Sequence, residues 1–123
     1  MAALTDLSYI KALLSRHGFT FSKALGQNFL INPSVCPKMA ELSGLNENAG
    51  ALEIGPGIGV LTEQLAKRSK HVVAVELDKR LLPLLAETLS PYDNISIIND
   101  DILKADLPKI IEDEFYSRGI TDI

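Results

Sequence analysis

The chain has 123 residues, of which 46% are hydrophobic and 23% are charged. This length and composition are typical of one globular domain and exclude a disordered, collagen-like or low-complexity chain. The single cysteine, Cys36, excludes an internal disulfide framework and a zinc site made of cysteines. The sequence has no apolar run long enough for a membrane-spanning helix, and Asp6 and Lys11 interrupt the apolar pattern near its start. We therefore expect no membrane partner, no signal peptide and no bound metal.

The formal net charge of −4 at pH 7 is unevenly distributed along the chain. Residues 1–40 have four basic side chains and one acidic side chain, a balance of +3, while the remaining residues have a balance of −7. The acidic total argues against a nucleic-acid-binding protein. The basic N-terminal part can still contact phosphate through Lys11, Arg16 and Lys23, although a solvated helix face is the simpler interpretation.

The N-terminal third of the sequence predicts two short helices separated by a loop. Residues 6–17 have an amphipathic pattern, and Gly18 ends the predicted helix. Residues 19–33 are rich in small and polar side chains and predict a loop, and residues 34–43 predict a second helix that ends at Gly44. The apolar face of the first helix is formed by Leu7, Ile10, Leu13 and Leu14.

From residue 50 the pattern changes to alternating strands and helices. Short apolar runs predict three strands, at residues 51–54, 71–76 and 95–98. Helical patterns follow these strands at residues 60–67, 78–89 and 106–116, and residues 119–123 have the pattern of a fourth strand beginning. Asp78 is the expected cap of the second helix, which Pro83 interrupts early. This alternation predicts the α/β class, with a parallel sheet and right-handed crossovers.

A glycine-rich loop, Gly55-Pro56-Gly57-Ile58-Gly59, follows the first predicted strand and opens the next helix. Doubly wound folds bind nucleotides at this position, where the carboxyl ends of the strands meet helix N-termini. Glycines allow a tight turn and a close approach of the backbone to a ligand. The simpler interpretation is a tight strand-to-helix turn without a ligand.

Acidic residues at the ends of the predicted strands favour an adenosine ligand. Glu76 ends the second strand, where a carboxylate can accept hydrogen bonds from both ribose hydroxyls. Asp101 follows the third strand and can accept a hydrogen bond from the adenine amine. Glu53 precedes the glycine loop and can orient it or meet an amino group of the ligand, unless it is simply a buried carboxylate bonded to loop amides. Both NAD and S-adenosylmethionine fit, and the short glycine spacing with Pro56 favours the second.

A further motif carries a family resemblance. Residues 23–30 have the sequence K-A-L-G-Q-N-F-L, upstream of E-I-G-P-G-I-G, V-E-L-D and N-D-D-I-L. In this combination the chain resembles the small-subunit ribosomal RNA adenine N6,N6-dimethyltransferases over nearly its whole length. The macrolide-resistance RNA methyltransferases share Gln-Asn-Phe and the glycine loop, but they usually lack the Lys-x-x-Gly that precedes them.

The resemblance implies a Rossmann-like methyltransferase domain that uses S-adenosyl-L-methionine. The implied activity is dimethylation of two adjacent adenines near the 3′ end of small-subunit ribosomal RNA, by a monomeric cytoplasmic enzyme acting on a pre-ribosomal particle. Gln27 and Asn28 would line the methionine side, Glu76 would hold the ribose, and Asp101 with Ile102 would meet the adenine. The whole implied cofactor site consists of Gln27, Asn28, Leu30, Gly55, Gly57, Gly59, Glu76, Leu77, Asp101 and Ile102.

The sequence departs from the family by lacking several of its parts. The catalytic Asn-[Leu/Ile]-Pro-[Tyr/Phe] motif, which follows the fourth strand in the family, does not occur in this sequence, so we assign no catalytic residue. We expect residues 1–49 to form an N-terminal helical segment and residues 50–123 the first half of the cofactor-binding domain, truncated after about three strands and without the C-terminal RNA-binding domain. Such a chain would be inactive alone, bind the cofactor weakly and self-associate along the open edge at residues 52–54.

Three other functions remain open from the sequence. One is a macrolide-resistance-type methyltransferase acting on large-subunit ribosomal RNA. Another is a noncatalytic RNA-binding assembly factor on the same scaffold. The most distant alternative is an NAD-dependent enzyme.

Overall fold

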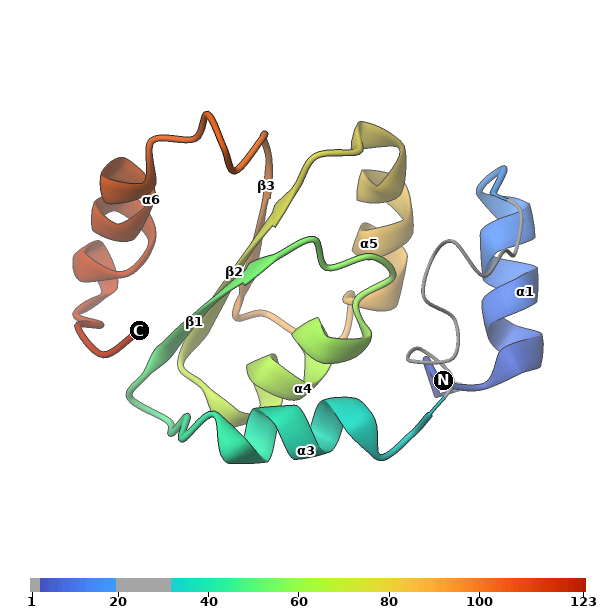
Figure 1. The fold of residues 1–123 in the computed structure, drawn as a ribbon, viewed down its shortest axis with the longest axis horizontal. Helices are drawn as coiled ribbons and strands as arrows, with labels where there is room; N and C mark the ends of the chain where they lie inside the picture. The colour runs from blue at the N-terminus through green and yellow to red at the C-terminus, as the bar shows by residue number, and fades with distance from the viewer. Residues whose placement is uncertain (1–2, 20–31) are drawn as a thin grey trace.

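Three parallel strands form the sheet of this computed structural model, which describes residues 3–19 and 32–123. The strands are β1 (Gly50–Ile54), β2 (His71–Glu76) and β3 (Ile95–Asn99), and they lie side by side in that order (Figure 1). The register pairs Gly50 with His71 and Val72 with Ile95. The central strand β2 is buried along its whole length. This burial explains its unbroken apolar sequence, because a parallel strand covered on both faces has no solvent-facing side.

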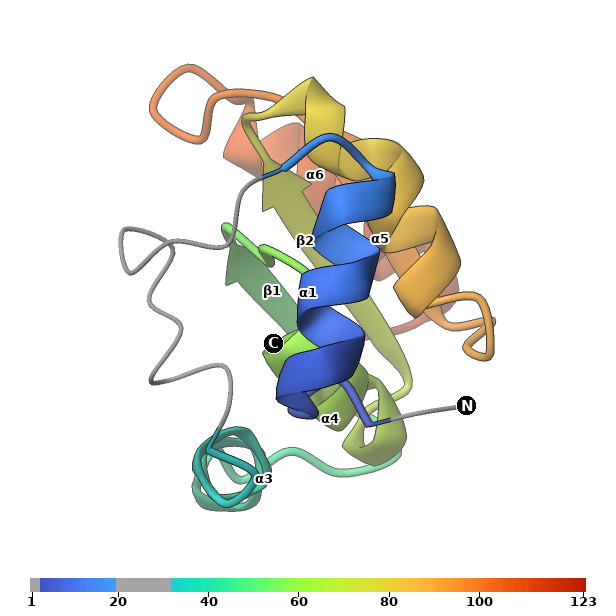
Figure 2. The ribbon, with the colours of Figure 1, turned by 90° about the vertical axis from the view of Figure 1, so that its right-hand side faces the viewer.

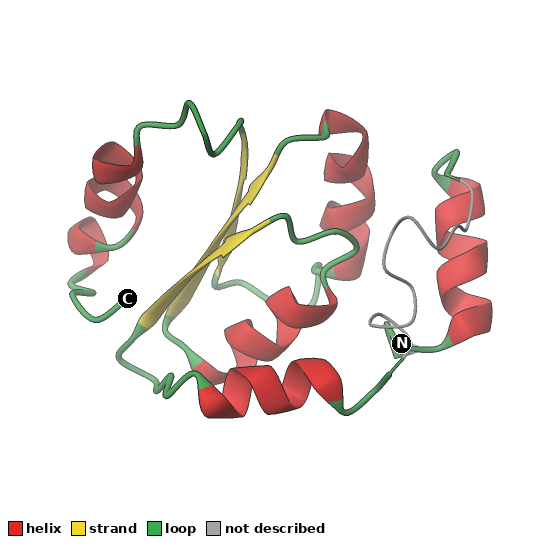
Figure 3. Cartoon of the chain, viewed as in Figure 1, coloured by secondary structure: helices red, strands yellow, loops and turns green. Residues whose placement is uncertain are grey.

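The helices cover both faces of the sheet. α4 (Val60–Arg68) connects β1 to β2, and the 3-10 turn η2 (Lys79–Leu81) with α5 (Leu82–Thr88) connects β2 to β3. α6 (Leu107–Glu114) and the 3-10 turn η3 (Tyr116–Arg118) follow β3 and lie on the opposite face (Figures 1 and 3). Neighbouring residues of β2 show the two faces: Val72 packs with Leu65 of α4, whereas Val73 packs with Ile110 of α6.

The N-terminal helix α1 (Leu7–Arg16) packs beside the glycine loop and α5 (Figure 2). The side chain of Asp6 caps its start by accepting a hydrogen bond from the backbone nitrogen of Tyr9 at 3.1 Å. At its other end Gly18 has a φ of +79°, and the next backbone N–H, of Phe19, donates to the carbonyl of Leu14 at 2.7 Å. This closing bond is the helix-ending arrangement that favours glycine.

The second N-terminal helix, α3 (Val35–Leu42), packs against α4. It ends before Gly44, whose φ is +76°. The two predicted N-terminal helices, the three parallel strands and the α/β class are therefore confirmed. Among the residues that the structure describes, none belongs to a helix long and apolar enough to cross a membrane.

Two of the predicted helices differ from the structure. The segment 78–89 was expected to be helical with an early interruption at Pro83, and it is the η2 turn followed by α5, with Pro83 in the first turn of α5. Proline lacks an N–H and clashes with the preceding turn, so it is accommodated only where a helix starts. The expected helix 106–116 is shorter, because α6 ends at Glu114 and a separate 3-10 turn follows.

The last residues lie beside the start of β1. No strand is assigned to residues 119–123. The backbone N–H of Gly50 nevertheless donates to the carbonyl of Asp122 at 2.8 Å. Farther along the same strand, Ile54 is 60% exposed. The predicted fourth strand is thus represented by a single backbone contact at one end of β1.

Candidate functional site

The glycine loop forms the tight turn that its sequence predicts. Gly55, Gly57 and Gly59 have φ values of +72°, +60° and +96°. Residues that have a side chain rarely adopt these backbone angles, so every second position of the loop requires glycine. The loop is closed by a hydrogen bond from the backbone N–H of Gly59 to the carbonyl of Pro56 at 2.9 Å, and Gly59 then forms the N-cap of α4.

The three glycines have different surroundings. A Cβ atom built on Gly55 or Gly57 would have no other atom within 4 Å. A Cβ on Gly59 would lie 2.9 Å from Cδ2 of Leu89 and 3.2 Å from Oγ1 of Thr88. The same Thr88 hydroxyl donates to the carbonyl of Ile58 at 2.8 Å. The end of α5 therefore supports the loop from behind, and the first two glycines face open space.

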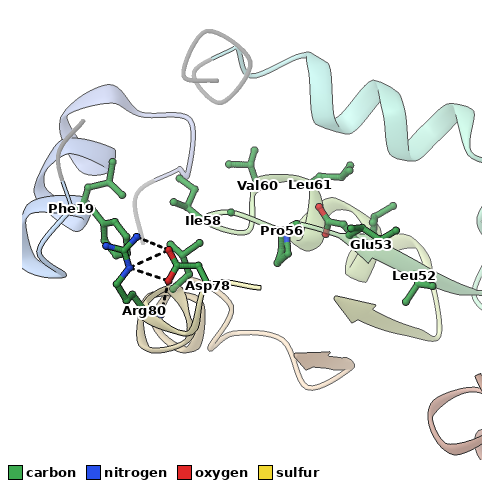
Figure 4. Close-up of a pocket in the computed structure, with 15 residues that line it drawn as sticks. Phe19, Leu52, Glu53, Pro56, Ile58, Val60, Leu61, Asp78 and Arg80 are labelled. Carbon is green, nitrogen blue, oxygen red and sulfur yellow. Dashed lines mark hydrogen bonds and ion pairs between the residues drawn. The ribbon is translucent and has the colours of Figure 1, made fainter. Parts of the chain in front are cut away.

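A cavity of about 630 Å³ borders this open side of the loop (Figure 4). This volume is within the usual range for a small-molecule or cofactor site. Most of its wall is apolar and includes Pro56, Leu52 of β1 and the side chains of Val60, Leu61 and Leu65 of α4. Among the described residues, the charged side chains in its wall are Glu53, Asp78 and Arg80. An apolar cavity with a few charged groups suits a ligand that has both a hydrophobic part and ionic ends.

Glu53 is the carboxylate that lies nearest the glycine loop in the sequence, and it lines this cavity. Its Oε1 atom accepts a hydrogen bond of 2.5 Å from the hydroxyl of Thr62, a fully buried residue of α4. Burial raises the pKa of Glu53 above its usual value, and the Thr62 hydrogen bond opposes that shift. A cationic group of a ligand would offset this burial cost, so the geometry suits an ammonium group.

The two other predicted acids lie at neighbouring strand ends. Glu76 is only 6% exposed, and its Oε2 atom accepts a hydrogen bond from the backbone N–H of Asp78 at 2.8 Å. Asp101 follows β3, and its Oδ1 atom accepts from the backbone N–H of Leu103 at 3.0 Å. The Asn99 amide connects the two strand ends by donating to the carbonyl of Glu76 at 2.8 Å. Neither carboxylate is among the described residues that line the cavity.

The remaining predicted site residues divide into two groups. Leu77 is exposed beside Glu76, and Ile102 is half-buried beside Asp101. Gln27, Asn28 and Leu30 lie outside the described residues. Of the predicted cofactor-site residues, Gly55 and Gly57 line the cavity. The assignment of the other positions to a cofactor stays a prediction.

The cavity residues that sequence reasoning missed as site residues include Phe19, Asp78 and Arg80. Phe19 directly follows the glycine that ends α1, while the other two belong to the turn after β2. Asp78 was expected only as a helix cap, a role that it fulfils by accepting from the backbone N–H of Arg80 at 2.9 Å. Its position two residues after Glu76 was the available signal for a second role.

Part of the basic N-terminal charge is paired within the chain. Arg16 donates two hydrogen bonds to the carboxylate of Glu87 in α5, at 2.9 and 2.7 Å, and His17 contacts the same carboxylate at 3.1 Å. These partners lower the pKa of Glu87 to about 2, Arg16 having the larger effect. The positive charge of Arg16 therefore helps to attach α1 to α5. Within residues 3–19 and 32–123, no cluster of His, Cys, Asp and Glu has the arrangement of a metal site.

Comparison with solved structures defines the class of protein. The chain superposes on the 23S ribosomal RNA methyltransferase ErmE with a TM-score of 0.54 and 41% identity, over 57% of this chain and 29% of that one. It superposes on a dimethyladenosine transferase from Plasmodium falciparum with a TM-score of 0.58 and 24% identity, over 68% and 35% of the two chains. The fold is thus that of the Rossmann-like methyltransferases, with the glycine loop at the carboxyl end of the first strand.

Sequence comparison identifies the family. The family model for ribosomal RNA adenine dimethylase matches residues 18–120, and the chain belongs to this family. It is 55% identical over 113 residues to ribosomal RNA small subunit methyltransferase A of Geobacillus sp. (strain WCH70), covering 92% of this chain and 38% of that protein. The corresponding protein of Anoxybacillus flavithermus is 57% identical over 105 residues, 85% of this chain and 36% of its own length. The chain therefore spans little more than a third of the length of these relatives.

Proposed function

We propose that this chain forms the cofactor-binding part of an S-adenosylmethionine-dependent enzyme that dimethylates adenines of small-subunit ribosomal RNA. The observation that carries the proposal is the cavity on the open side of Gly55 and Gly57, in a chain of the ribosomal RNA adenine dimethylase family. Ligands of open α/β sheets bind at this edge, beyond the carboxyl ends of the strands.

The residues of this edge fit the chemical groups of the cofactor. Glu53, a partly buried carboxylate in the cavity wall, would accept hydrogen bonds from the ammonium group of the cofactor's methionine part. Glu76 would accept the ribose hydroxyls, and Asp101 the adenine amine. Leu77 and Ile102, which adjoin these two acids, would supply apolar contact. The glycine backbone would approach the ligand closely because no Cβ atom stands in the way.

The bound cofactor supplies a methyl group activated by its sulfonium centre. The chain's own contribution is to bind the cofactor and hold it in a fixed position. Positioning supplies much of the rate of such a transfer, because the reacting atoms must be aligned. The family's Asn-[Leu/Ile]-Pro-[Tyr/Phe] motif is not in this sequence. We therefore expect these 123 residues alone to transfer no methyl group.

The proposed substrate is small-subunit ribosomal RNA within a pre-ribosomal particle, and the proposed location is the cytoplasm. The names of the two relatives support the small-subunit substrate. ErmE, named for 23S ribosomal RNA, is the reason to test both RNAs. The full-length protein, meaning this chain at the length of its relatives, should methylate immature small subunits and leave large-subunit RNA unmodified. The reverse result would assign the chain to the macrolide-resistance type of enzyme.

The cofactor site is tested by calorimetry on the full-length protein. Replacing Glu76 with alanine removes the acceptor for two hydroxyls and should weaken S-adenosylmethionine binding by about 2–3 kcal/mol, because hydrogen bonds to charged groups are worth about 1.5–3 kcal/mol. Glu76→Gln keeps the shape and one acceptor and should lose less. Glu112→Ala removes an exposed carboxylate from α6 and is the matched control. Unchanged affinity in Glu76→Ala would refute the ribose assignment, and a wild-type protein that does not bind would refute the proposed function.

A further inference from the structure

One end of the cavity is formed by two segments that are distant in the sequence. Phe19 follows α1, whereas Asp78 and Arg80 follow β2, and Figure 4 shows the three side chains gathered at the end opposite Leu52. Phe19 also packs against the apolar cluster that contains Ile58 of the glycine loop. This end of the cavity therefore depends on a tertiary contact between the N-terminal segment and the turn after β2.

Asp78 holds the Arg80 side chain in one orientation. Its Oδ1 atom accepts a hydrogen bond from Nε of Arg80 at 3.0 Å, and Oδ2 accepts from Nε at 3.1 Å and from Nη2 at 2.7 Å. The Arg80 side chain is 71% exposed and would otherwise sample many rotamers. Because the guanidinium is a planar group with donors in fixed directions, pairing with the carboxylate also fixes the orientation of its plane.

The oriented guanidinium lies over the ring of Phe19. Cζ of Arg80 is 5.2 Å from the ring centroid, which is within the range of a cation–π contact. The backbone of Phe19 is held independently, by the 2.7 Å hydrogen bond from its N–H to Leu14 at the end of α1. The hydrogen bond to α1 thus fixes the backbone of Phe19, and Arg80 contacts the face of its ring.

Asp78 also contacts Glu76, the predicted ribose acceptor. The backbone N–H of Asp78 donates to Oε2 of Glu76 at 2.8 Å, and the side chain of Asp78 holds Arg80. We propose that Arg80 is a positioning residue for the cofactor site, holding the Phe19 ring as one wall of the cavity. The inference rests on the proposed function, because it assigns S-adenosylmethionine to this cavity. Arg80 acts through Phe19 and needs no contact with the reacting atoms.

The test is a double-mutant cycle in the full-length protein, with S-adenosylmethionine binding measured by calorimetry. Arg80→Ala removes the cation over the ring and should weaken binding about two- to fivefold, the range that one exposed cation–π contact supports. Phe19→Leu should weaken binding to a similar extent, and the double variant should lose no more than either single variant. Arg80→Lys keeps the charge without the planar fork and should be intermediate. Arg68→Ala removes an exposed arginine from the far end of α4 and should bind as the wild type does.

Kinetics and NMR separate positioning from a loss of stability. At saturating RNA, Arg80→Ala should raise KM for S-adenosylmethionine with kcat unchanged, because the wall contributes binding without acting on the transition state. In the free protein, the Nε–H resonance of Arg80 should show the ring current of Phe19 and lose it in Phe19→Leu. Circular dichroism should show that every variant is folded.

The outcomes distinguish this inference from the function on which it rests. If the wild-type protein binds the cofactor while the two single effects simply add, or while Arg80→Ala binds normally, the positioning role is overturned and the proposed function stands. A fall in kcat with unchanged KM also overturns it. If the wild-type protein binds no cofactor, the proposed function fails and the positioning role fails with it.

Discussion

The two ends of the sheet use the same strands for different purposes. At the carboxyl end of β1, Gly55 and Gly57 border a cavity and would tolerate the volume of an added Cβ atom. At the amino end, a Cβ on Gly50 would lie 2.6 Å from two ring atoms of Phe115, a fully buried residue. Glycine therefore leaves open space at one end and allows close packing at the other.

The amino end is also closed by a polar network. Nε2 of His71 lies 2.9 Å from the hydroxyl of Ser96, which donates to Oε2 of Glu114 at 3.0 Å. Arg118 donates to the same carboxylate at 3.0 Å, and the His71 ring meets the edge of Phe115 with centroids 6.3 Å apart. α6 and η3 are anchored to the sheet through these contacts. The amino end is thus closed by packing and polar contacts, whereas the carboxyl end is open at Gly55 and Gly57, where we propose that the ligand binds, and four predictions test this comparison.

The largest effect is expected at Gly59, where the loop meets the packed interior. In Gly59→Ala the backbone would have to keep a φ of +96°, and the new Cβ would lie 2.9 Å from Cδ2 of Leu89 and 3.2 Å from Oγ1 of Thr88, at the end of α5. The substitution should therefore lower the free energy of unfolding by about 2–4 kcal/mol. Urea denaturation measures the loss. Gly57→Ala is the matched control, because it has a φ of +60° but no neighbour within 4 Å and should cost about 1–2 kcal/mol from strain alone. Equal losses in the two variants would contradict the support from α5.

Gly50→Ala should have the next largest effect. The added methyl group displaces the Phe115 ring in a closely packed region, and overpacking of this kind costs about 1–3 kcal/mol. Combining it with Phe115→Leu should give less loss than the sum of the two single variants, since the smaller side chain leaves room for the methyl group. Strict additivity in urea denaturation would show that the ring is not the obstacle. Cofactor affinity should not change in Gly50→Ala, because the site lies at the other end of the strand.

At the carboxyl end, Glu53→Gln should change how stability depends on pH. Burial raises the pKa of Glu53 above its ordinary value of 4.5, so the stabilising contribution of this carboxyl group is fully present below about pH 4.5 and is lost as pH rises through the folded-state pKa. Glutamine does not titrate and can still accept from Thr62. The variant should therefore gain stability relative to the wild type as pH rises from 4 to 7, while its cofactor affinity falls. A constant difference across that range would show that the carboxylate is not destabilised by burial.

The smallest effect is expected from His71 at the amino end, with the opposite sign. Burial is the main cause that lowers the pKa of His71 below 6.5, and Arg118 acts in the same direction while Glu114 opposes them. Its stabilising contribution is present above pH 6.5 and is lost as pH falls through the folded-state pKa, because the unfolded state then binds the proton more readily. His71→Gln should lose this pH dependence in urea denaturation between pH 7 and 5. If the variant and the wild type change in parallel, the histidine is not the group responsible.

The parts of the fold that could be predicted from the sequence are those set by residues close together in the chain. The strand at residues 71–76 was predicted with the bounds of β2, because a run of β-branched residues buried on both faces leaves little ambiguity. The end of α1 was also predicted, since Gly18 allows the positive φ that closes a helix. The interruption at Pro83 was predicted as well, because proline belongs at a helix start, but periodicity did not reveal that the residues before it form a separate 3-10 turn.

In the candidate site, too, features set by neighbouring residues could be predicted from the sequence, and contacts between distant residues could not. The spacing of Gly55, Gly57 and Gly59 predicted a tight turn, because the requirement for glycine is a local property of the backbone, and the structure adds the positive φ values and the cavity beside the loop. The sequence also placed Glu76 and Asp101 at neighbouring strand ends, since parallel strands present their carboxyl ends at one edge. It could not distinguish the open glycines from Gly59, whose surroundings come from residues about thirty positions away.

By itself, the sequence determined the class of fold, the family and the place of the glycine loop. These follow from periodicity and motifs, in which each residue acts on its neighbours in the chain. Only the tertiary structure decided that Thr62 bonds to Glu53, that Arg80 covers Phe19, and that Gly50 meets Phe115. Each of these contacts depends on how separate helices and turns pack around the sheet. The side chains involved carry no local signal for their partner, because the energy of a contact exists only after the segments have been brought together.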